Sequence, residues 1–312
     1  MRAATFRDGG VVTSELPDPV AGSGEVLVRV RAAGLNGADV LQRAGLYPAP
    51  PGSSPDVPGL ELAGEVVRLG EGATRFGVGE RVMGIVGGGG QAELAVVHER
   101  QLMAVPDALD WAAAGGLPEV FTTAHDALFT QAGLCAGERL LVHGGAGGVG
   151  TAAIQLGCAT AARVSATVRN PELHEAVAKL GAQVVLPDEF AEHGPFDVIL
   201  ELVGAPNLER NLQALATGGR ICVIGVSAGA VGQLNLLALM ERRARIHGST
   251  LRARSLEEKA QTARLLERHV LPLFQTGQLH VPIAERYPLD EVARAYQRFT
   301  AGGKFGKIVL TL

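Results

Sequence analysis

Polar and apolar residues alternate along the first third of the chain, which is the pattern of half-buried β-strands. In residues 25–33, valines at every second position share one face, while Arg29 and Arg31 share the other. Turn signals recur nearby, in the proline-rich residues 48–55 and in the consecutive glycines of residues 87–90. The first part of the chain is therefore predicted to form a small antiparallel β domain.

The pattern changes near Asp110, where an alanine-rich stretch opens a helix and short apolar runs then alternate with helical segments. Four of these runs are predicted to be buried parallel strands, at residues 139–143, 163–168, 197–202 and 220–225. Helices are expected to fill the gaps between them. This part of the chain therefore predicts a doubly wound parallel sheet.

Beyond the parallel strands, the sequence predicts two helices and a terminal strand, at residues 256–274, 289–299 and 305–310. The chain has 312 residues, more than the roughly 100–200 usual for one domain, so two domains are expected. Hydrophobic residues make up 47% of the chain and aromatic residues only 4%, so the core must consist mainly of Val, Leu, Ala and Ile. These features predict an α/β fold.

Charge and hydropathy narrow the class of partner. The net charge is −4, with both signs interspersed along the chain. No block of like charges favours nucleic acid or an anionic membrane, and no segment reaches the roughly 18 uninterrupted apolar residues of a membrane span. We therefore expect a soluble protein whose partner is a small molecule.

The three cysteines bear on metal content and location. Cys135, Cys158 and Cys222 lie far apart and show no CxxC spacing, which argues against a zinc site or a disulfide framework. The chain begins with charged residues rather than an apolar run, so no secretory signal is predicted. A reducing cytoplasm is the expected location.

A glycine loop at residues 144–150 follows the first predicted parallel strand and leads into a predicted helix. Gly145, Gly147 and Gly150 fit the pattern GxGxxG. Glycine permits a tight turn, a close approach of the backbone to a pyrophosphate, and close packing of helix on strand. The N–H groups at the start of the helix then attract the phosphates. The alternative is a glycine-rich turn, but the flanking strand and helix favour a dinucleotide site.

The residue that binds the 2′-substituent of the cofactor's ribose, and so distinguishes NAD from NADP, is expected at the end of the next strand. No Asp or Glu lies between Thr151 and Pro171, whereas a carboxylate there would bind the 2′-hydroxyl of NAD. Arg169 instead ends the predicted strand, beside Asn170 and Pro171, which are predicted as N-cap and first helical residue. Arg169 is a candidate ligand of the 2′-phosphate of NADP, and the alternative is a solvated loop arginine.

The loop, its place after an N-terminal β domain, residues 118–124 (PEVFTTA) and the ending GKIVL at residues 306–310 carry a family resemblance. The chain resembles the zinc-free, zeta-crystallin-like quinone oxidoreductases of the medium-chain dehydrogenase/reductase superfamily, most closely the p53-inducible quinone oxidoreductase branch. The resemblance implies a GroES-like catalytic domain at residues 1–115, a Rossmann domain at residues 116–260, and a return to the catalytic domain at residues 261–312.

Zinc-dependent relatives carry a cysteine where this chain has Asn36. They carry Gly-His-Glu where this chain has Gly59, Leu60 and Glu61. Their four-cysteine lobe is also missing from this sequence. The resemblance therefore implies that no metal takes part.

Asn36 and Tyr47 match an asparagine and a Gly-Leu-Tyr-Pro segment that, in the family, line the interdomain cleft near the nicotinamide. The resemblance assigns them the catalytic role of hydrogen bonding to the acceptor's oxygen. From the residues alone, Asn36 can equally cap a helix and Tyr47 can be an ordinary loop aromatic.

The glycine loop and the resemblance together assign the cofactor contacts. The assigned residues are Thr123, Gly145, Ala146, Gly147, Gly148, Val149, Gly150, Arg169, Asn170, Val203, Gly225, Val226, Ser227, Leu251, Arg252 and Lys304. Lys304 falls where relatives often carry an asparagine near the adenosine phosphate, although a solvated lysine is the alternative. The chain departs from the family at Leu173, where a phosphate-binding lysine is common, and at residues 186–197, where one crossover is shortened. His143 is expected to support the core or the loop.

The implied activity is zinc-independent hydride transfer from NADPH to a quinone. An alkenal or enone reductase is the second reading, because hydride addition to an α,β-unsaturated carbonyl needs nearly the same site. A non-enzymatic NADPH- or RNA-binding crystallin-like protein is the third, and the lack of a basic stripe argues against RNA. The family also implies a homodimer, for which residues 243–250 form a candidate edge strand.

Overall fold

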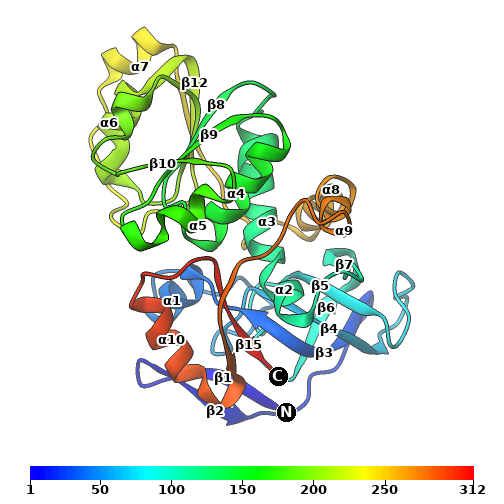
Figure 1. Ribbon diagram of the computed structural model, residues 1–312. Coiled ribbons are helices and arrows are strands. Elements are labelled where there is room, and N and C mark those ends of the chain that lie inside the picture. Colours follow the sequence, from blue (N-terminus) through cyan, green and yellow to red (C-terminus); the bar gives the residue numbers. More distant parts are fainter. The chain divides into compact units, whose positions relative to one another are not determined.

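The computed structural model describes residues 1–312 and divides into two compact units (Figure 1). The first unit contains Met1–Thr122, Leu251–Gly302 and Lys307–Leu312. The second contains Thr123–Thr250 and the short segment Gly303–Gly306. Both chain ends therefore belong to the first unit. No helix is long and apolar enough to cross a membrane.

The first unit is built on a seven-stranded sheet with the order β14-β15-β3-β4-β5-β7 and with β6 also paired to β3. Its strands are β3 (Glu25–Gly34), β4 (Glu61–Leu69), β5 (Arg81–Ile85), β6 (Leu94–His98), β7 (Leu102–Ala104), β14 (Ile283–Pro288) and β15 (Lys307–Thr311). A separate hairpin joins β1 (Arg2–Arg7) and β2 (Gly10–Glu15). The predicted alternation is confirmed, since Val26, Val28 and Val30 are at most 1% exposed.

Helices of the first unit come from both ends of the chain. They are α1 (Gly37–Arg43), α2 (Trp111–Gly116), the beginning of α3 (Pro118–His125), α8 (Leu256–His269), α9 (Leu271–Gln275) and α10 (Val292–Thr300). Short 3-10 turns, η1 (Glu99–Gln101) and η6 (Leu289–Glu291), precede β7 and α10. The prediction of a single helix at residues 256–274 is wrong in one respect, because the helix is broken at Val270. Pro272 lacks an N–H and its ring crowds the preceding turn, so α9 starts anew there.

The second unit contains a six-stranded sheet, parallel throughout, with the order β10-β9-β8-β11-β12-β13. Its strands are β8 (Arg139–Val142), β9 (Arg163–Thr167), β10 (Gln183–Val185), β11 (Phe196–Glu201), β12 (Leu215–Val223) and β13 (Arg245–Gly248). The four predicted parallel strands are confirmed, although β12 begins earlier than expected. The strand order reverses between β8 and β11, which is the switch point of a Rossmann sheet.

Helices cover both faces of this sheet, with α4 and α5 on one side and α6 and α7 on the other (Figure 1). They are α4 (Gly148–Ala159), α5 (His174–Ala178), α6 (Leu208–Gln213) and α7 (Leu236–Arg242), together with the turns η3 (Pro171–Leu173), η4 (Phe190–His193) and η5 (Ala205–Asn207) and the π-helix η2 (Asp126–Gln131). The shortened crossover is confirmed, since only η4 connects β10 to β11.

A buried polar network joins the carboxyl ends of three central strands. His143, at the end of β8, has one ring nitrogen 2.7 Å from Asn211 Oδ1 and the other 3.2 Å from Thr167 Oγ1. Asn211 Nδ2 donates to Glu201 Oε2 at 2.6 Å, so Asn211 Oδ1 must be the acceptor toward His143. His143 is therefore the Nε2–H tautomer, and its Nδ1 accepts from the Thr167 hydroxyl.

The same network fixes two loops at this edge of the sheet. Thr167 Oγ1 accepts the N–H of Gly144 at 3.2 Å, where the glycine loop begins. Glu201 Oε1 accepts the N–H groups of Val203 at 2.6 Å and Gly204 at 2.8 Å, in the loop after β11. All four network side chains are buried. The expected supporting role of His143 is confirmed.

Burial makes the stability of the second unit depend on pH. Desolvation lowers the pKa of His143 below its ordinary 6.5, and the nearby Glu201 carboxylate offsets this only in part. A depressed histidine pKa favours the folded state above pH 6.5, and this contribution decreases as the pH falls below that value.

We therefore predict that replacing His143 by Gln reduces the loss of stability on acidification. Between pH 7.5 and 5.5 the wild-type protein should lose up to about 1.4 kcal/mol through this residue, the equivalent of one pKa unit. Thermal unfolding at the two pH values measures the difference. His193→Gln, at an exposed histidine, is the matched control. An equal pH dependence in His143→Gln and wild type would contradict the prediction.

Candidate functional site

The glycine loop of the second unit connects β8 to α4, which confirms the predicted strand–loop–helix context. Two glycines are required by close packing. A Cβ on Gly145 would lie 2.8 Å from Ala166 Cβ, and one on Gly150 would lie 2.3 Å from the carbonyl oxygen of Gly144. The helix can therefore start directly beneath the loop, and its first N–H groups are directed at the space that a pyrophosphate needs.

The segment Gly303–Gly306 packs against this loop within the same unit. The N–H of Gly306 donates to the carbonyl oxygen of Ala146 at 2.9 Å, and Gly147 forms a parallel β-bridge with Gly306. Lys304 is two residues from this bridge and is partly exposed. The structure thus brings Lys304, from near the end of the chain, to the glycine loop.

Arg169 follows β9, the strand next to β8. Its side chain is exposed and forms no hydrogen bond or ion pair within the chain. Asn170 accepts the N–H of Glu172 at 3.1 Å, and Pro171 occupies the first turn of η3, so both predicted capping roles are confirmed. The strand end is therefore held in place while the arginine remains available to a ligand.

The other residues assigned to the cofactor in the second unit also follow parallel strands. Val203 follows β11 and is anchored through Glu201. Gly225, after β12, donates to the main-chain oxygen of Glu201 at 3.1 Å, and Val226 and Ser227 beside it are exposed. Ala146, Gly148 and Val149 lie in the glycine loop and the first turn of α4. The structure thus collects these assigned residues at one edge of the sheet.

Thr123 belongs to the same unit, in the part of α3 that is assigned to it. It is 6% exposed. His125, two residues further along the helix, is 5% exposed and packs with its ring centre 5.1 Å from that of Phe129. Both side chains interact with other groups in the chain.

In the first unit, Asn36 belongs to a buried polar cluster with Glu61 and Lys307. Lys307 Nζ donates to Asn36 Oδ1 and lies equally close to Glu61 Oε1, at 2.7 Å in each case. Asn36 Nδ2 donates to Glu61 Oε1 at 2.9 Å. Its second amide hydrogen has only a long contact, 3.4 Å, with the carbonyl oxygen of Gly34. Asn36 occupies the N-cap position of α1, as the alternative interpretation predicted. Its carboxamide, however, binds the Glu61–Lys307 ion pair.

Asp39 ties this cluster to the segment before β4. It is completely buried and accepts the N–H of Asn36 at 2.8 Å and the N–H of Gly59 at 3.1 Å. Burial raises the pKa of Asp39 to about 6, although these N–H donors and the Lys307 ammonium act in the opposite direction. The cluster therefore fixes the two chain segments where zinc-dependent relatives carry ligands. No group of three or more His, Cys, Asp and Glu side chains has the geometry to hold a metal ion.

Tyr47 is held by Arg252, which is itself 3% exposed. The Arg252 guanidinium donates to the carbonyl oxygens of Tyr47 and Gly87, both at 2.8 Å, and to Gln42 Oε1 at 2.6 Å. It also lies 5.3 Å from the centre of the Tyr47 ring, within cation–π range. Arg252, which the sequence assigns to the cofactor, is thus engaged in positioning the loop of Tyr47. Burial raises the pKa of the half-buried Tyr47 phenol, with a contribution from Glu119.

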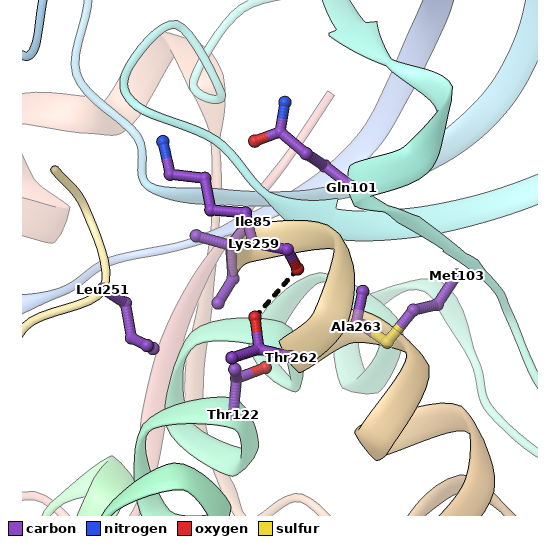
Figure 2. A pocket seen from close by; sticks show the side chains of 8 residues that line it. All are labelled: Ile85, Gln101, Met103, Thr122, Leu251, Lys259, Thr262 and Ala263. Atoms are coloured by element: carbon purple, nitrogen blue, oxygen red, sulfur yellow. Dashed lines mark hydrogen bonds between the residues drawn. The ribbon is translucent and has the colours of Figure 1, made fainter. Parts of the chain in front are cut away.

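Leu251 lines a small pocket of about 10 Å³ in the first unit (Figure 2). Four apolar and four polar residues surround it: Ile85, Met103, Leu251 and Ala263, and Gln101, Thr122, Lys259 and Thr262. None of the four polar residues was singled out from the sequence, because they come from three separate chain segments and form no local motif.

Comparison with known proteins supports the assignment of both units. Residues 22–107 match the family model "Alcohol dehydrogenase GroES-like domain", and residues 180–310 match "Zinc-binding dehydrogenase". The chain is 33% identical to a quinone oxidoreductase from Lama guanicoe, covering 96% of this chain and 92% of that protein. It is 32% identical to a quinone oxidoreductase from Homo sapiens, covering 100% and 98%.

A solved structure of a mycobacterial protein complexed with NADPH matches the fold with a TM-score of 0.89. Its sequence identity is 27%, and the match covers the whole of both chains. The fold is therefore the α/β architecture of a GroES-like domain and a Rossmann domain. The chain belongs to the quinone oxidoreductases of the medium-chain dehydrogenase/reductase superfamily, a family of oxidoreductases that use a nicotinamide dinucleotide.

Proposed function

We propose that this protein is an NADPH-dependent quinone oxidoreductase that transfers hydride without zinc. The observation that carries the choice of NADPH is the placement of two cationic residues, Arg169 and Lys304, in the unit that holds the glycine loop. A dinucleotide with a third phosphate group needs positive charge beyond the helix N-terminus. The exposed guanidinium of Arg169 can form two parallel hydrogen bonds to the 2′-phosphate, and no Asp or Glu lies between Thr151 and Pro171 to favour NADH.

The similarity to a mycobacterial protein that was solved with NADPH supports the same choice. When bound, the cofactor supplies hydride. The protein's own residues have to orient the acceptor and donate hydrogen bonds to the oxygen on which negative charge develops.

We assign that task to Tyr47 and Asn36. The Tyr47 phenol is protonated at neutral pH, since burial raises its pKa above the ordinary value of 10, so it can donate a hydrogen bond, and Arg252 fixes its loop. Asn36 has one amide hydrogen bound to Glu61, while the other makes only the 3.4 Å contact with Gly34. This second hydrogen is the one that we expect to donate to the acceptor. Glu61 and Lys307 hold the carboxamide in a single orientation.

The first prediction from this proposal concerns the acceptor. Purified protein should oxidise NADPH rapidly with a quinone and slowly with a short alkenal, which absorbance at 340 nm reports in both cases. A faster reaction with the alkenal would assign the protein to the enone reductases instead. If several quinones and alkenals all failed to accelerate NADPH oxidation, the reductase function would be rejected. Binding of RNA at physiological salt would then favour a non-enzymatic role.

The second prediction concerns Arg169. Arg169→Ala should reduce the preference for NADPH over NADH, expressed as the ratio of kcat/KM values, by about tenfold or more, since a charge-assisted pair to phosphate is lost. Arg163→Ala removes an exposed arginine from the opposite end of the same strand and is the matched control. An unchanged preference in Arg169→Ala would rule out this residue as the phosphate ligand.

We also propose that the protein is a homodimer joined through the second unit. The strand β13 is an edge of the sheet, so one side of it has no strand partner. Beside it, α7 and the loop before it expose apolar side chains: Val231 is 93% exposed, Leu236 65%, Leu237 63% and Met240 71%. An apolar surface next to an open strand edge is suited to a second copy of the chain. The three free thiols accord with a cytoplasmic location, which we propose as well.

A charge placed on this surface should separate the subunits. Met240→Glu is expected to convert the dimer to a monomer of 32.3 kDa, as measured by light scattering after gel filtration. Val78→Glu is the control, because Val78 is 66% exposed and lies in the first unit. A wild-type protein that is already monomeric, or a Met240→Glu variant that stays dimeric, would show that this surface is not the interface.

A further inference from the structure

A row of buried hydrogen bonds leads from α10 to the N-cap of α1 within the first unit. Tyr296, on α10, donates its hydroxyl to Gln91 Oε1 at 3.0 Å. Gln91 directs its amide nitrogen at Asp39 Oδ2, 3.4 Å away, and Asp39 accepts the N–H of Asn36. Tyr296 is 1% exposed, and Gln91 and Asp39 are completely buried. The row therefore ends, away from solvent, at a residue that we assign to the acceptor.

The backbone of Gln91 is fixed on both sides, which limits the freedom of its side chain. Its N–H donates to the carbonyl oxygen of Pro58 at 3.0 Å, and its carbonyl oxygen accepts the N–H of Ala4 at 2.9 Å. A Cβ on Gly59, the residue after Pro58, would lie 2.4 Å from the Gln91 nitrogen, so a glycine is required for this approach. Gln91 thus presents its amide from a rigid position.

The Asp39 carboxylate accepts N–H groups on both of its oxygens. Oδ2 accepts from Asn36 at 2.8 Å and faces the Gln91 amide at 3.4 Å, while Oδ1 accepts from Gly59 at 3.1 Å. An ionised carboxylate can only accept, so the amide nitrogen of Gln91 must face Asp39, and the amide oxygen is left for Tyr296. A proton on Oδ2 would point at two N–H groups and would displace the contact with Asn36.

Several charged groups act on Asp39 from the other elements packed around it. Burial raises the pKa of Asp39 to about 6, the N–H donors and the Lys307 ammonium oppose this, and the Glu61 carboxylate adds to it. Arg252 attracts the same carboxylate, and the Tyr296 phenol stays neutral, because burial raises its pKa well above the ordinary value of 10. The carboxylate is therefore ionised at neutral pH and takes up a proton in mildly acidic solution.

We propose that Asp39 is a positioning residue of the acceptor site. Its carboxylate, held by Gln91 and Tyr296, keeps Asn36 where its carboxamide can donate to the acceptor's oxygen, and a proton on the carboxylate releases Asn36. This inference rests on the proposed function and adds to it residues that act through Asn36 rather than on the acceptor. A displacement of about 1 Å can reduce a rate by about a hundredfold, so the loss of this one N–H contact is enough to slow turnover.

The test is the pH dependence of quinone reduction by the full-length protein at saturating NADPH, between about pH 5.5 and 8. The wild-type kcat/KM should fall about tenfold for each pH unit below about 6, because protonated Asp39 no longer holds Asn36. Asp39→Asn resembles the protonated acid in shape and charge. Its kcat should be about tenfold lower than that of wild type at about pH 8, with KM much less affected, and should not fall further in acid.

Tyr296→Phe tests the row from its other end. Without the hydroxyl, the Gln91 amide can turn its oxygen toward the carboxyl group, which suits the protonated acid. The decrease of kcat/KM in acid should therefore begin about half a pH unit higher. Tyr287→Phe is the matched control, because the Tyr287 hydroxyl donates to Glu285 on β14 and should leave the profile unchanged. Equal profiles in the two variants would remove Tyr296 from the proposal.

Protein stability provides a readout that needs no turnover. A carboxyl group whose pKa is raised by folding favours the folded state when it is protonated, so acid increases the contribution of Asp39 to the free energy of unfolding. The free energy of unfolding of Asp39→Asn relative to wild type, measured with urea, should therefore decrease as the pH falls below about 6. Asp107→Asn, at an exposed carboxylate of the same unit, should show neither this trend nor a change in kcat.

The two proposals can fail separately. If the wild-type protein reduces no quinone at any pH, the proposed function is rejected, and the role of Asp39 in it as well. If it reduces quinones and Asp39→Asn has the same kcat and the same pH profile, the reductase function stands and the positioning role of Asp39 is rejected.

Discussion

The close approach of α4 to the end of β8 is the constraint on which the dinucleotide site depends. Only glycine fits at Gly145 and Gly150, where an added Cβ would overlap Ala166 and the backbone of Gly144. This contact directs the start of a twelve-residue helix at the loop. The polar network beneath it, from His143 to Glu201, then fixes the neighbouring strand ends, so the loop and the positions after β9, β11 and β12 form one preorganised edge.

The first unit uses buried charge for the same purpose. Bringing Lys307 and Glu61 out of water costs several kcal/mol, and only good geometry offsets this cost. The 2.7 Å contacts to Glu61 and Asn36, and a third to the carbonyl oxygen of Leu35, meet that condition. A buried ion pair of this kind contributes orientation more than stability. It holds the Asn36 carboxamide in a single position, which is what a hydrogen-bond donor to a substrate needs.

Much of the fold could be predicted because it is encoded locally. The valines of β3 recur at every second position, β8, β9, β11 and β12 are continuous apolar runs, and the glycine loop is a local motif. Each of these signals lies within a few consecutive residues and can therefore be recognised in the sequence. The three-residue strand β10 was missed, since so short a run has no periodicity. The partners of Asn36 were missed for a different reason. Lys307 lies 271 residues away from it, and only the pairing of β15 with β3 brings the two side chains together.

The two buried cations of the first unit, Arg252 and Lys307, are already engaged in holding other parts of the chain. Two buried carboxylates, Asp39 and Glu61, face Arg252 and Lys307, so these four charges offset one another. Both cations are also fully engaged in holding loops and side chains, and neither can move toward a new anion without exposing a carboxylate to an apolar interior. Charge that develops on an acceptor must therefore be met by hydrogen-bond donors outside this balanced set, the role that we assign to Tyr47 and Asn36.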